Sequence, residues 1–315
     1  MATPSTDGRV SRRAMLRGGT LFLAAGAFAA NAPWTDCAAA ARDAEPDEGD
    51  DAKPLLRIGL VTDLHYADKP AAGSRHYRLS VERLERAVAE FDANAVDAIV
   101  ELGDLVDAAD SDKTELAWLR TINDNLAAAK APRYYVLGNH CVDTLTKEQF
   151  LGGVAQEKSF FSFDVKDHHC IVLDACFRAD GKPYGAKNAS WDDANLAAAE
   201  LEWLAADLAA TKLPTLVFAH QRLDVTTKYA AKNAADARKL LEASQKVLAV
   251  FQGHEHKNDH REVEGIHYAT LAALVEGGPA KQGEKETNAF AVLDVFAGGK
   301  LAVRGFAKQA SYDWR

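Results

Sequence analysis

Five short polar motifs, each directly after an apolar run of strand length, constrain this chain more than any other feature of its sequence. The apolar runs are Leu56–Thr62, Ala98–Leu102, Arg133–Leu137, Pro214–Ala219 and Val247–Gln252. The motifs that follow them are, in the same order, Asp63-Leu64-His65, Gly103-Asp104, Gly138-Asn139-His140, His220 and Gly253-His254-Glu255-His256. Ligands of open α/β sheets bind at the carboxyl ends of the strands, so we expect the five motifs to meet at one point.

The segments between these runs carry the apolar spacing of amphipathic helices. Helices are predicted over Ser80–Asn94, Ser111–Lys130 and Asp192–Ala210, with a cap at Ser111. Shorter apolar runs predict a hairpin of Phe160–Val165 with His169–Leu173 and three final antiparallel strands, Ile266–Leu271, Phe290–Phe296 and Leu301–Phe306. The strand–helix–strand rhythm favours right-handed crossovers and a parallel sheet, so the sequence predicts an α/β fold.

The motifs together offer two carboxylates, one amide and four imidazoles as ligands. These seven side chains belong to Asp63, His65, Asp104, Asn139, His220, His254 and His256, and the further imidazole of His140 lies beside them. Such a set suits a pair of borderline divalent metals. Residues two apart in an extended segment face the same side, so Asp63 with His65, and His254 with His256, are expected to act together. Two neighbouring metals can activate a water for attack on a phosphate ester.

A single Asp-x-His or Gly-Asp motif carries little information, but all five motifs in this order are hard to obtain by chance. In them the chain resembles the calcineurin-like metallophosphoesterase superfamily, and the resemblance extends from Ile58 to the terminal strands. It implies a four-layer α/β/β/α sandwich with two mixed sheets and a binuclear metal centre.

The resemblance also implies a role for each motif residue. Asp63, His65 and His256 would hold one divalent metal, whereas Asn139, His220 and His254 would hold the other, and Asp104 would bridge both. A hydroxide between two such cations (Mn, Zn or Fe) would form near neutral pH and attack the phosphate. His140 would stay unligated and would stabilise the transition state or protonate the leaving group.

Two positions depart from related patterns. The family has Asp or Glu after the motif histidine, where this chain has Cys141; a thiol is a weak hydrogen-bond partner, so Cys141 is interpreted as a small buried filler. Asp143 could supply the missing carboxylate. Asp107 occupies the position where purple acid phosphatases have a tyrosine ligand, which argues against an iron(III)–tyrosinate site and leaves Mn²⁺, Zn²⁺ or Fe²⁺.

Several further side chains could line a substrate cleft. Arg75 or Arg78, in the loop after His65, could hold a phosphate through two hydrogen bonds, although solvated surface arginines are the common alternative. The tryptophans at 118, 191 and 203 are interpreted as helix packing rather than as a substrate platform. Three cysteines follow Cys37, and an extended strand would hold Cys170 and Cys176 too far apart to bond, so no obligatory disulfide is expected.

The first residues read as an export signal. Arg12-Arg13 precede the apolar run 18–30, which is too short to span a bilayer, so residues 1–41 are predicted to be a twin-arginine signal peptide. The acidic segment 42–54 is predicted to be a disordered tether, and 55–315 the metallophosphoesterase domain. The mature protein would then have no stable membrane span. It would be periplasmic or extracellular, exported in folded form by the twin-arginine machinery.

The net charge of the chain limits the classes of substrate that it is expected to bind. The formal net charge is −9, and it becomes −11 without residues 1–41, so no basic stripe is left to hold a nucleic acid backbone. Small phosphate esters, steered by local cations, are favoured over polyanions. The sequence therefore predicts an exported binuclear phosphohydrolase, with phosphomonoesters as the first choice of substrate. The alternatives are a phosphodiesterase or nucleotide pyrophosphohydrolase with the same centre, and a non-catalytic metal- or phosphate-binding protein.

Overall fold

Two mixed six-stranded sheets carry the motifs. The computed structural model describes residues 53–279 and 287–314. The first sheet contains β1 (Leu56–Val61), β2 (Ala98–Glu101), β3 (Arg133–Tyr135), β10 (Ala289–Val295), β11 (Leu301–Ala307) and β12 (Tyr312–Trp314), in the order β12-β11-β10-β1-β2-β3. β1, β2 and β3 are parallel, and β10 pairs antiparallel with β1. The carboxyl ends of β1, β2 and β3 therefore lie at one edge.

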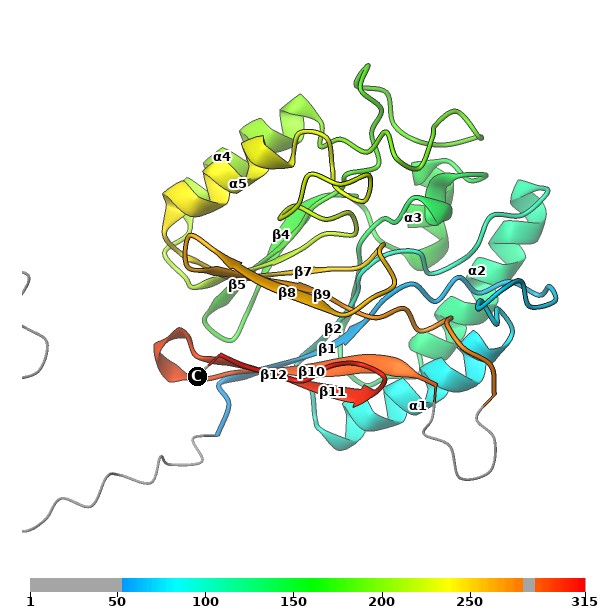
Figure 1. Ribbon diagram of the computed structural model, residues 1–315, viewed down its shortest axis with the longest axis horizontal. Coiled ribbons are helices and arrows are strands. Elements are labelled where there is room, and N and C mark those ends of the chain that lie inside the picture. The colour runs from blue at the N-terminus through cyan, green and yellow to red at the C-terminus, as the bar shows by residue number, and fades with distance from the viewer. Residues whose placement is uncertain (1–52, 280–286, 315) are drawn as a thin grey trace, which may run out of the picture. The chain divides into compact units, whose positions relative to one another are not determined.

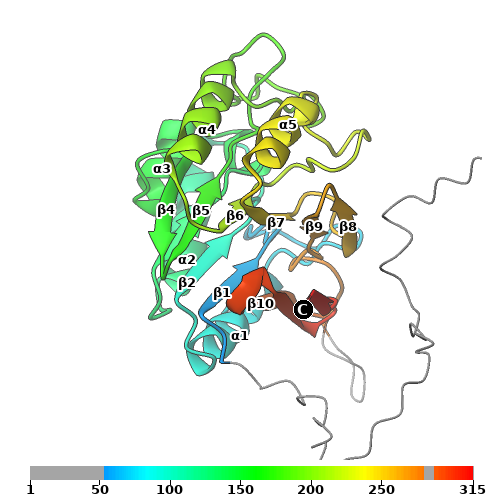
Figure 2. The same cartoon turned by 90° about the vertical axis from the view of Figure 1, so that its left-hand side faces the viewer.

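The second sheet has four parallel strands between two antiparallel edge strands. It contains β4 (Phe161–Val165), β5 (His168–Val172), β6 (Thr215–Phe218), β7 (Val247–Gln252), β8 (Asp259–Val263) and β9 (Ile266–Thr270), in the order β4-β5-β6-β7-β9-β8. β5, β6, β7 and β9 run parallel, whereas β4 and β8 pair antiparallel with β5 and β9. Figure 2 shows the two sheets stacked on each other.

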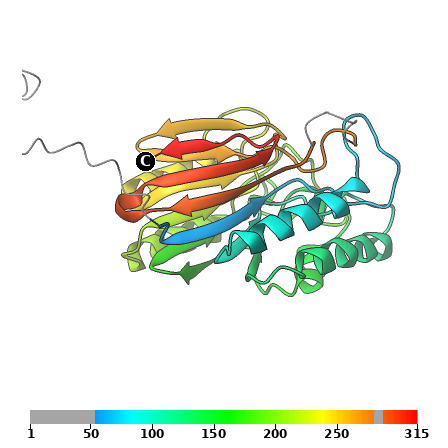
Figure 3. The ribbon, with the colours of Figure 1, turned by 90° about the horizontal axis from the view of Figure 1, so that it is seen from below.

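Helices cover the outer faces of both sheets, which gives the four-layer α/β/β/α arrangement visible in Figure 1. The helices are α1 (Leu79–Ala93), α2 (Asp112–Leu126) and α3 (Lys147–Val154) on the first sheet, and α4 (Ala198–Ala210) and α5 (Ala234–Ser244) on the second. Figure 3 shows α1 across the outer face of the first sheet, next to β1. Ile58, Phe218 and Phe251 belong to the apolar layer between the sheets. The predicted fold class is confirmed.

Most predicted elements are present, and two helices are shorter than predicted: α2 ends at Leu126 instead of Lys130, and α4 begins after Asp192. Ser111 caps α2, its Oγ accepting from the Thr114 N–H at 3.2 Å. The helix predicted from Asp192 begins only at Ala198, because the backbone before it bonds elsewhere. The Asn195 N–H donates to the carbonyls of Ala175 and Phe177, and the Leu196 N–H donates to Asn233 Oδ1 at 2.9 Å. Segment 192–197 is therefore a loop tied to its neighbours.

The final strands are divided between the two sheets. β9 pairs parallel with β7 and antiparallel with β8, whereas β10 crosses to the first sheet and lies beside β1. They were predicted to be antiparallel strands, which holds for β10 with β11 and for β9 with β8, whereas the pairing of β9 with β7 is parallel. Strands β8 and β12 were missed because edge strands of this length carry little apolar alternation.

The remaining predictions from the sequence concern the cysteines, membrane-spanning helices and the first residues of the chain. Cys141, Cys170 and Cys176 are buried and free, as expected. Within residues 53–279 and 287–314, no helix is long and apolar enough to cross a membrane. The predicted signal peptide, 1–41, and residues 42–52 of the predicted tether lie outside the described residues.

The packing of α1 on β1 yields a stability prediction. A Cβ added to Gly59 in β1 would lie 2.8 Å from the Phe91 ring of α1, which is closer than real Cβ contacts come. We expect Gly59→Ala to lower the free energy of unfolding by about 1–3 kcal/mol through overpacking. Gly152→Ala in α3 is the matched control, because nothing lies within 4 Å of its added Cβ. Urea unfolding measures both, and an unchanged midpoint for Gly59→Ala would contradict this packing.

Candidate metal centre

The structure brings the side chains of all five motifs together at the carboxyl ends of the strands. Asp63 and His65 follow β1, Asp104 follows β2, Asn139 and His140 follow β3, His220 follows β6, and His254 and His256 follow β7. The first sheet thus contributes both carboxylates and the amide. The second sheet contributes three imidazoles, so the cluster joins the two sheets.

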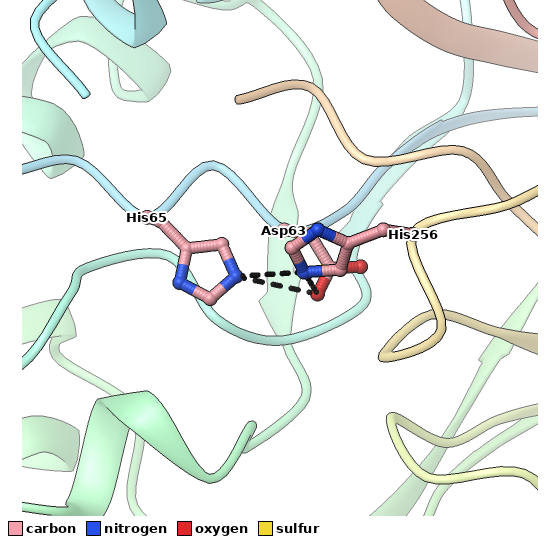
Figure 4. Close-up of side chains that lie close together, drawn as sticks. All are labelled: Asp63, His65 and His256. Carbon is pink, nitrogen blue, oxygen red and sulfur yellow. Dashed lines mark hydrogen bonds and ion pairs between the residues drawn. The ribbon is translucent and has the colours of Figure 1, made fainter. Parts of the chain in front are cut away.

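One half of the cluster consists of Asp63, His65 and His256, shown in Figure 4. The Asp63 Oδ1 atom lies 3.2 Å from His256 Nε2 and 3.6 Å from His65 Nε2, and the two Nε2 atoms are 3.1 Å apart. One carboxylate oxygen and two imidazole nitrogens therefore face a common point. These three residues could hold one divalent cation.

The other half consists of Asp104, His220 and His254. Asp104 Oδ2 lies 3.2 Å from His220 Nε2 and also 3.5 Å from His65 Nε2 in the first half. The carboxylate of Asp104 thus lies between the two groups of ligands. This is the position that a residue bridging two metals requires.

Buried polar atoms without partners test whether metals fit here. Asn139 Oδ1, His220 Nε2 and His254 Nε2 are buried, and none has a hydrogen-bond partner in the part of the chain that the structure describes. Buried polar atoms without hydrogen bonds are rare and call for an ion or a water. Because all three are good ligand atoms directed into one cluster, the residues fit a metal centre.

The backbone at the ligands is left-handed rather than extended. The φ angles are positive at Asp63 (53°), His65 (42°), Asp104 (59°), His254 (70°) and His256 (61°). Such angles are uncommon outside glycine and collect at functional sites. Asp63 and His65 do act in one group, but the reason given from sequence, an extended segment, was wrong. His254 and His256 fall in different groups of ligands.

Glycines next to the ligands leave room for the carboxylates. A Cβ at Gly138 would overlap Asp104 Oδ1, and one at Gly253 would lie 2.7 Å from Asp63 Oδ2. The backbone N–H groups beside these glycines use the same space: the His140 N–H donates to Asp104 Oδ1 at 2.8 Å, and the His254 N–H donates to Asp63 Oδ2 at 3.0 Å. Glycine is therefore required here by close approach.

Charge balance within the cluster depends on the histidines. Burial by itself would raise the pKa of the Asp63 and Asp104 carboxyls, but the surrounding imidazoles hold both pKa values below the usual range. Burial lowers the pKa of His256, but Asp63 and Glu276 outweigh it and raise that pKa to about 9. Burial and the charge of His220 lower the pKa of His254 to about 3. His220 and His256, whose pKa values are raised, supply positive charge beside the two carboxylates.

Outer hydrogen bonds orient two of the ligand imidazoles. His220 Nδ1 lies 2.8 Å from the Leu102 carbonyl, so its proton is on Nδ1 and Nε2 faces the cluster. His256 Nδ1 lies 2.7 Å from Glu276 Oε1. Metal-binding histidines commonly use such partners to fix the ring. Glu276 was missed from sequence because no motif marks it.

Asp107, not Asp143, supplies a carboxylate to His140. Asp107 Oδ1 lies 2.5 Å from His140 Nδ1, and its Oδ2 lies 2.5 Å from Lys69 Nζ. Burial lowers the pKa of His140, but the negative charges of Asp104 and Asp107 raise it overall. Asp143 lines a neighbouring cavity instead, so the suggestion from sequence that it replaces the missing acid was wrong. Cys141 is a buried filler in the core, as interpreted.

A buried arginine joins the loops that carry the second-sheet histidines. Arg222, 3% exposed, follows His220 by two residues. Its Nη1 lies 2.5 Å from Glu255 Oε2, between the two histidines of the last motif, and its Nη2 lies 2.6 Å from Asp224 and from Asp259. The sequence did not single out Arg222, because this contact exists only when the two loops meet.

A cleft opens over the cluster and continues into a second cavity. The cavity over the cluster has a volume of about 230 Å³ and is lined by Arg75, Asp104, Asn139, His140, Trp191, Lys228, Tyr229, His254 and His256. A cavity of about 360 Å³ adjoins it and shares Asn139, His140 and Trp191. Arg78 pairs instead with Asp68 at the surface.

Trp191 lines both cavities and is 41% exposed, so its interpretation as helix packing was wrong. The other two tryptophans behave as interpreted, since Trp118 and Trp203 pack against the core.

Comparisons with known proteins agree with this geometry. The family model of the calcineurin-like phosphoesterases matches residues 56–258. The chain is 24% identical, over 306 residues, to a manganese-dependent ADP-ribose/CDP-alcohol diphosphatase from Oryza sativa subsp. japonica, covering 82% of this chain and 93% of the relative. A protein of the same description from Arabidopsis thaliana is 24% identical over 310 residues, covering 83% and 97%.

Solved structures show the same fold. A dimetal phosphatase from Danio rerio superposes with a TM-score of 0.72 at 19% identity, covering 84% of this chain and all of that one. A purple acid phosphatase from yellow lupin superposes with a TM-score of 0.54 at 15% identity, covering 82% of this chain and 52% of the other. Because the family model spans most of the chain and ends just beyond the last motif, the chain belongs to the calcineurin-like phosphoesterase family and is a hydrolase that acts on phosphate esters.

Proposed function

We propose that the chain is a binuclear metal-dependent hydrolase that cleaves the diphosphate bond of nucleoside diphosphate compounds. The observation that carries this proposal is the cleft, which runs from the ligand cluster past Trp191 into a second cavity of about 360 Å³. The second cavity provides room, beyond a phosphate at the metals, for a second phosphate and the organic group that it carries. The named activity of the two plant relatives gives independent support. We therefore prefer the alternative predicted from sequence to the phosphomonoesterase.

The metal ligands follow from the two halves of the cluster. Asp63, His65 and His256 would hold one cation, Asn139, His220 and His254 the other, and Asp104 would bind both. We propose manganese, because the plant relatives are described as manganese-dependent. When bound, two such cations supply Lewis acidity and activate a water for attack on phosphorus.

The remaining cleft residues would bind and protonate the substrate. His140, held by Asp107, would donate a proton or a hydrogen bond to a phosphoryl oxygen. Arg75 and Lys228 line the cavity over the cluster and would neutralise the second phosphate. The leaving group of a diphosphate is a phosphate, which departs more easily than an alkoxide. Its departure therefore depends less on proton donation by His140.

The substrate class can be tested with one assay matrix. Mature protein, stripped of metal with a chelator and reloaded with Mn²⁺, Zn²⁺, Co²⁺ or Fe²⁺, is offered ADP-ribose, a CDP-alcohol, a nitrophenyl phosphate monoester and the matching diester. We expect stripping to abolish hydrolysis, Mn²⁺ to restore it, and kcat/KM for the diphosphates to exceed that for the monoester at least about tenfold. If the monoester is hydrolysed faster than the other substrates with every metal, the chain is a phosphomonoesterase and the proposal is wrong.

Asp104→Asn is the control for that matrix. The substitution preserves the shape of the side chain but removes the charge between the two groups of ligands, so turnover should fall below detection. A protein that only binds metal or phosphate would show no turnover in either form, and this outcome would sink the catalytic proposal.

Removing the carboxylate beside His140 should change the pH profile. Because Asp107 raises the pKa of His140, Asp107→Asn lowers it, and the alkaline limb of the kcat profile should move to lower pH. A general acid contributes about 10²- to 10⁴-fold, so we expect kcat at pH 8 to fall at least about tenfold. Asp110→Asn, at an exposed position in the same loop, is the control. An alkaline limb that stays in place would rule out the role given to Asp107.

We also propose export by the twin-arginine route, supported by Arg12-Arg13 and the apolar run that follows. In a bacterium with this machinery, Arg12→Lys with Arg13→Lys should leave the full-length protein in the cytoplasm, whereas the unaltered chain should reach the periplasm with its N-terminus removed. Fractionation and immunoblotting measure the distribution, with Arg17→Lys as the matched control. Equal periplasmic amounts of the double variant and the unaltered chain would contradict the proposal.

A further inference from the structure

An exposed tryptophan stands in the wall between the two cavities. Leu55 and Trp191 are the large apolar side chains that lie exposed within the described residues, and Trp191 is the one beside the cleft. An aromatic ring left in water beside a polar cleft is a common ligand contact, since the ring can stack on a planar partner. The position of Trp191 therefore favours a ligand with a planar ring.

Trp191 belongs to a cluster of rings that reaches the ligand residues. Its ring centroid lies 5.6 Å from that of His254 and 5.8 Å from that of Tyr229, and the Tyr229 and His254 centroids are 5.7 Å apart. Lys228 Nζ lies 5.4 Å from the Trp191 centroid. A ring stacked on Trp191 is consequently next to the cavity over the metal ligands, where the phosphates would bind.

The two cavities that meet at Trp191 differ in chemistry. The one over the metal ligands contains Arg75 and Lys228, which suit phosphates. The other shares Asn139, His140 and Trp191 with the first and is otherwise lined by Val142, Asp143, Tyr184, Ala189 and Ser190. Apolar and aromatic side chains mixed with polar ones suit a nucleoside, because the carboxylate of Asp143 can accept hydrogen bonds from its N–H or O–H groups.

The loop that carries Trp191 is held in place before any ligand binds. The Tyr184 hydroxyl donates to the Ser190 carbonyl at 2.9 Å, and the Asp193 N–H donates to the same carbonyl at 3.0 Å. The Asn195 N–H binds the carbonyls after β5, which stops α4 from starting at Asp192. The platform is thus organised in advance, which lowers the entropy cost of binding.

We propose that Trp191 is the stacking platform of a nucleobase subsite and that the cavity beside it receives the nucleoside of the substrate. This inference rests on the proposed function for its phosphate position. The base stacks on the side of Trp191 that faces Val142 and Tyr184, while the diphosphate lies on the other side, between the metal ligands and the pair Arg75 and Lys228. The subsite selects substrates that carry a base over otherwise equal phosphates.

A matched pair of small ligands tests the subsite without turnover. AMP and ribose 5-phosphate share the phosphate and the ribose and differ in the base. Calorimetry on the Mn²⁺-loaded protein should show AMP binding at least about tenfold more tightly than ribose 5-phosphate. Trp191→Ala should remove that advantage and leave ribose 5-phosphate unchanged, whereas Trp191→Phe should retain most of it. Trp203→Phe, on α4 and packed against Phe160, is the control for fold.

The possible results separate this inference from the proposed function. Equal affinities for AMP and ribose 5-phosphate, binding of neither, or an equal loss of both in Trp191→Ala would overturn the subsite while leaving the hydrolase in place. A base advantage that depends on Trp191 supports the subsite even if the assay matrix detects no diphosphate hydrolysis. In that case the proposed reaction fails and the subsite stands.

Discussion

The rest of this structure depends on two buried carboxylates that need positive charge beside them. Asp63 and Asp104 are almost inaccessible to water, and a buried carboxylate is costly unless positive charge lies next to it. That charge comes from imidazoles, several of them on the opposite sheet. Because an imidazole can give up its proton, the same side chains can neutralise the carboxylates in one state and bind metal in the other. The charge balance therefore connects the two sheets.

Several local features follow from this need. Left-handed backbone at Asp63, His65, Asp104, His254 and His256 turns the chain sharply after β1, β2 and β7, so that these side chains point into the cluster instead of continuing along the sheet. Gly138 and Gly253 leave the space that the two carboxylates occupy. Backbone strain of this kind costs free energy and persists only where the surroundings hold it. Here the hydrogen bonds from the His140 and His254 N–H groups supply part of that support.

Site residues within short local motifs could be predicted from the sequence. Residues that reach the site only through contacts between distant segments could not. The ligands could be identified because each lies in a short motif just after an apolar strand. Asp107 stands near such a motif, yet its contact with His140 depends on how the loops after β2 and β3 meet. Glu276 contacts the motif histidine His256 from outside the motifs, and Arg222 contacts Glu255 of the last motif in the same way. Trp191 was interpreted as helix packing because the apolar spacing predicts a helix from Asp192, whereas the bonds of Asn195 and Leu196 decide where α4 begins.

The metal ligands and the residues that line the second cavity come from different parts of the fold. The ligands come from strand ends, fixed by the pairing of β1 with β2 and of β6 with β7, so a change there disturbs the sheets themselves. The cavity beyond His140 takes half of its lining from the loop between β5 and α4, whose isolated β-bridges lie within the loop itself. Substitutions in that loop alter the shape of the substrate cavity and leave the charge balance intact. The metal ligands therefore identify the reaction class, and under our proposal the loop around Trp191 selects which phosphate ester enters.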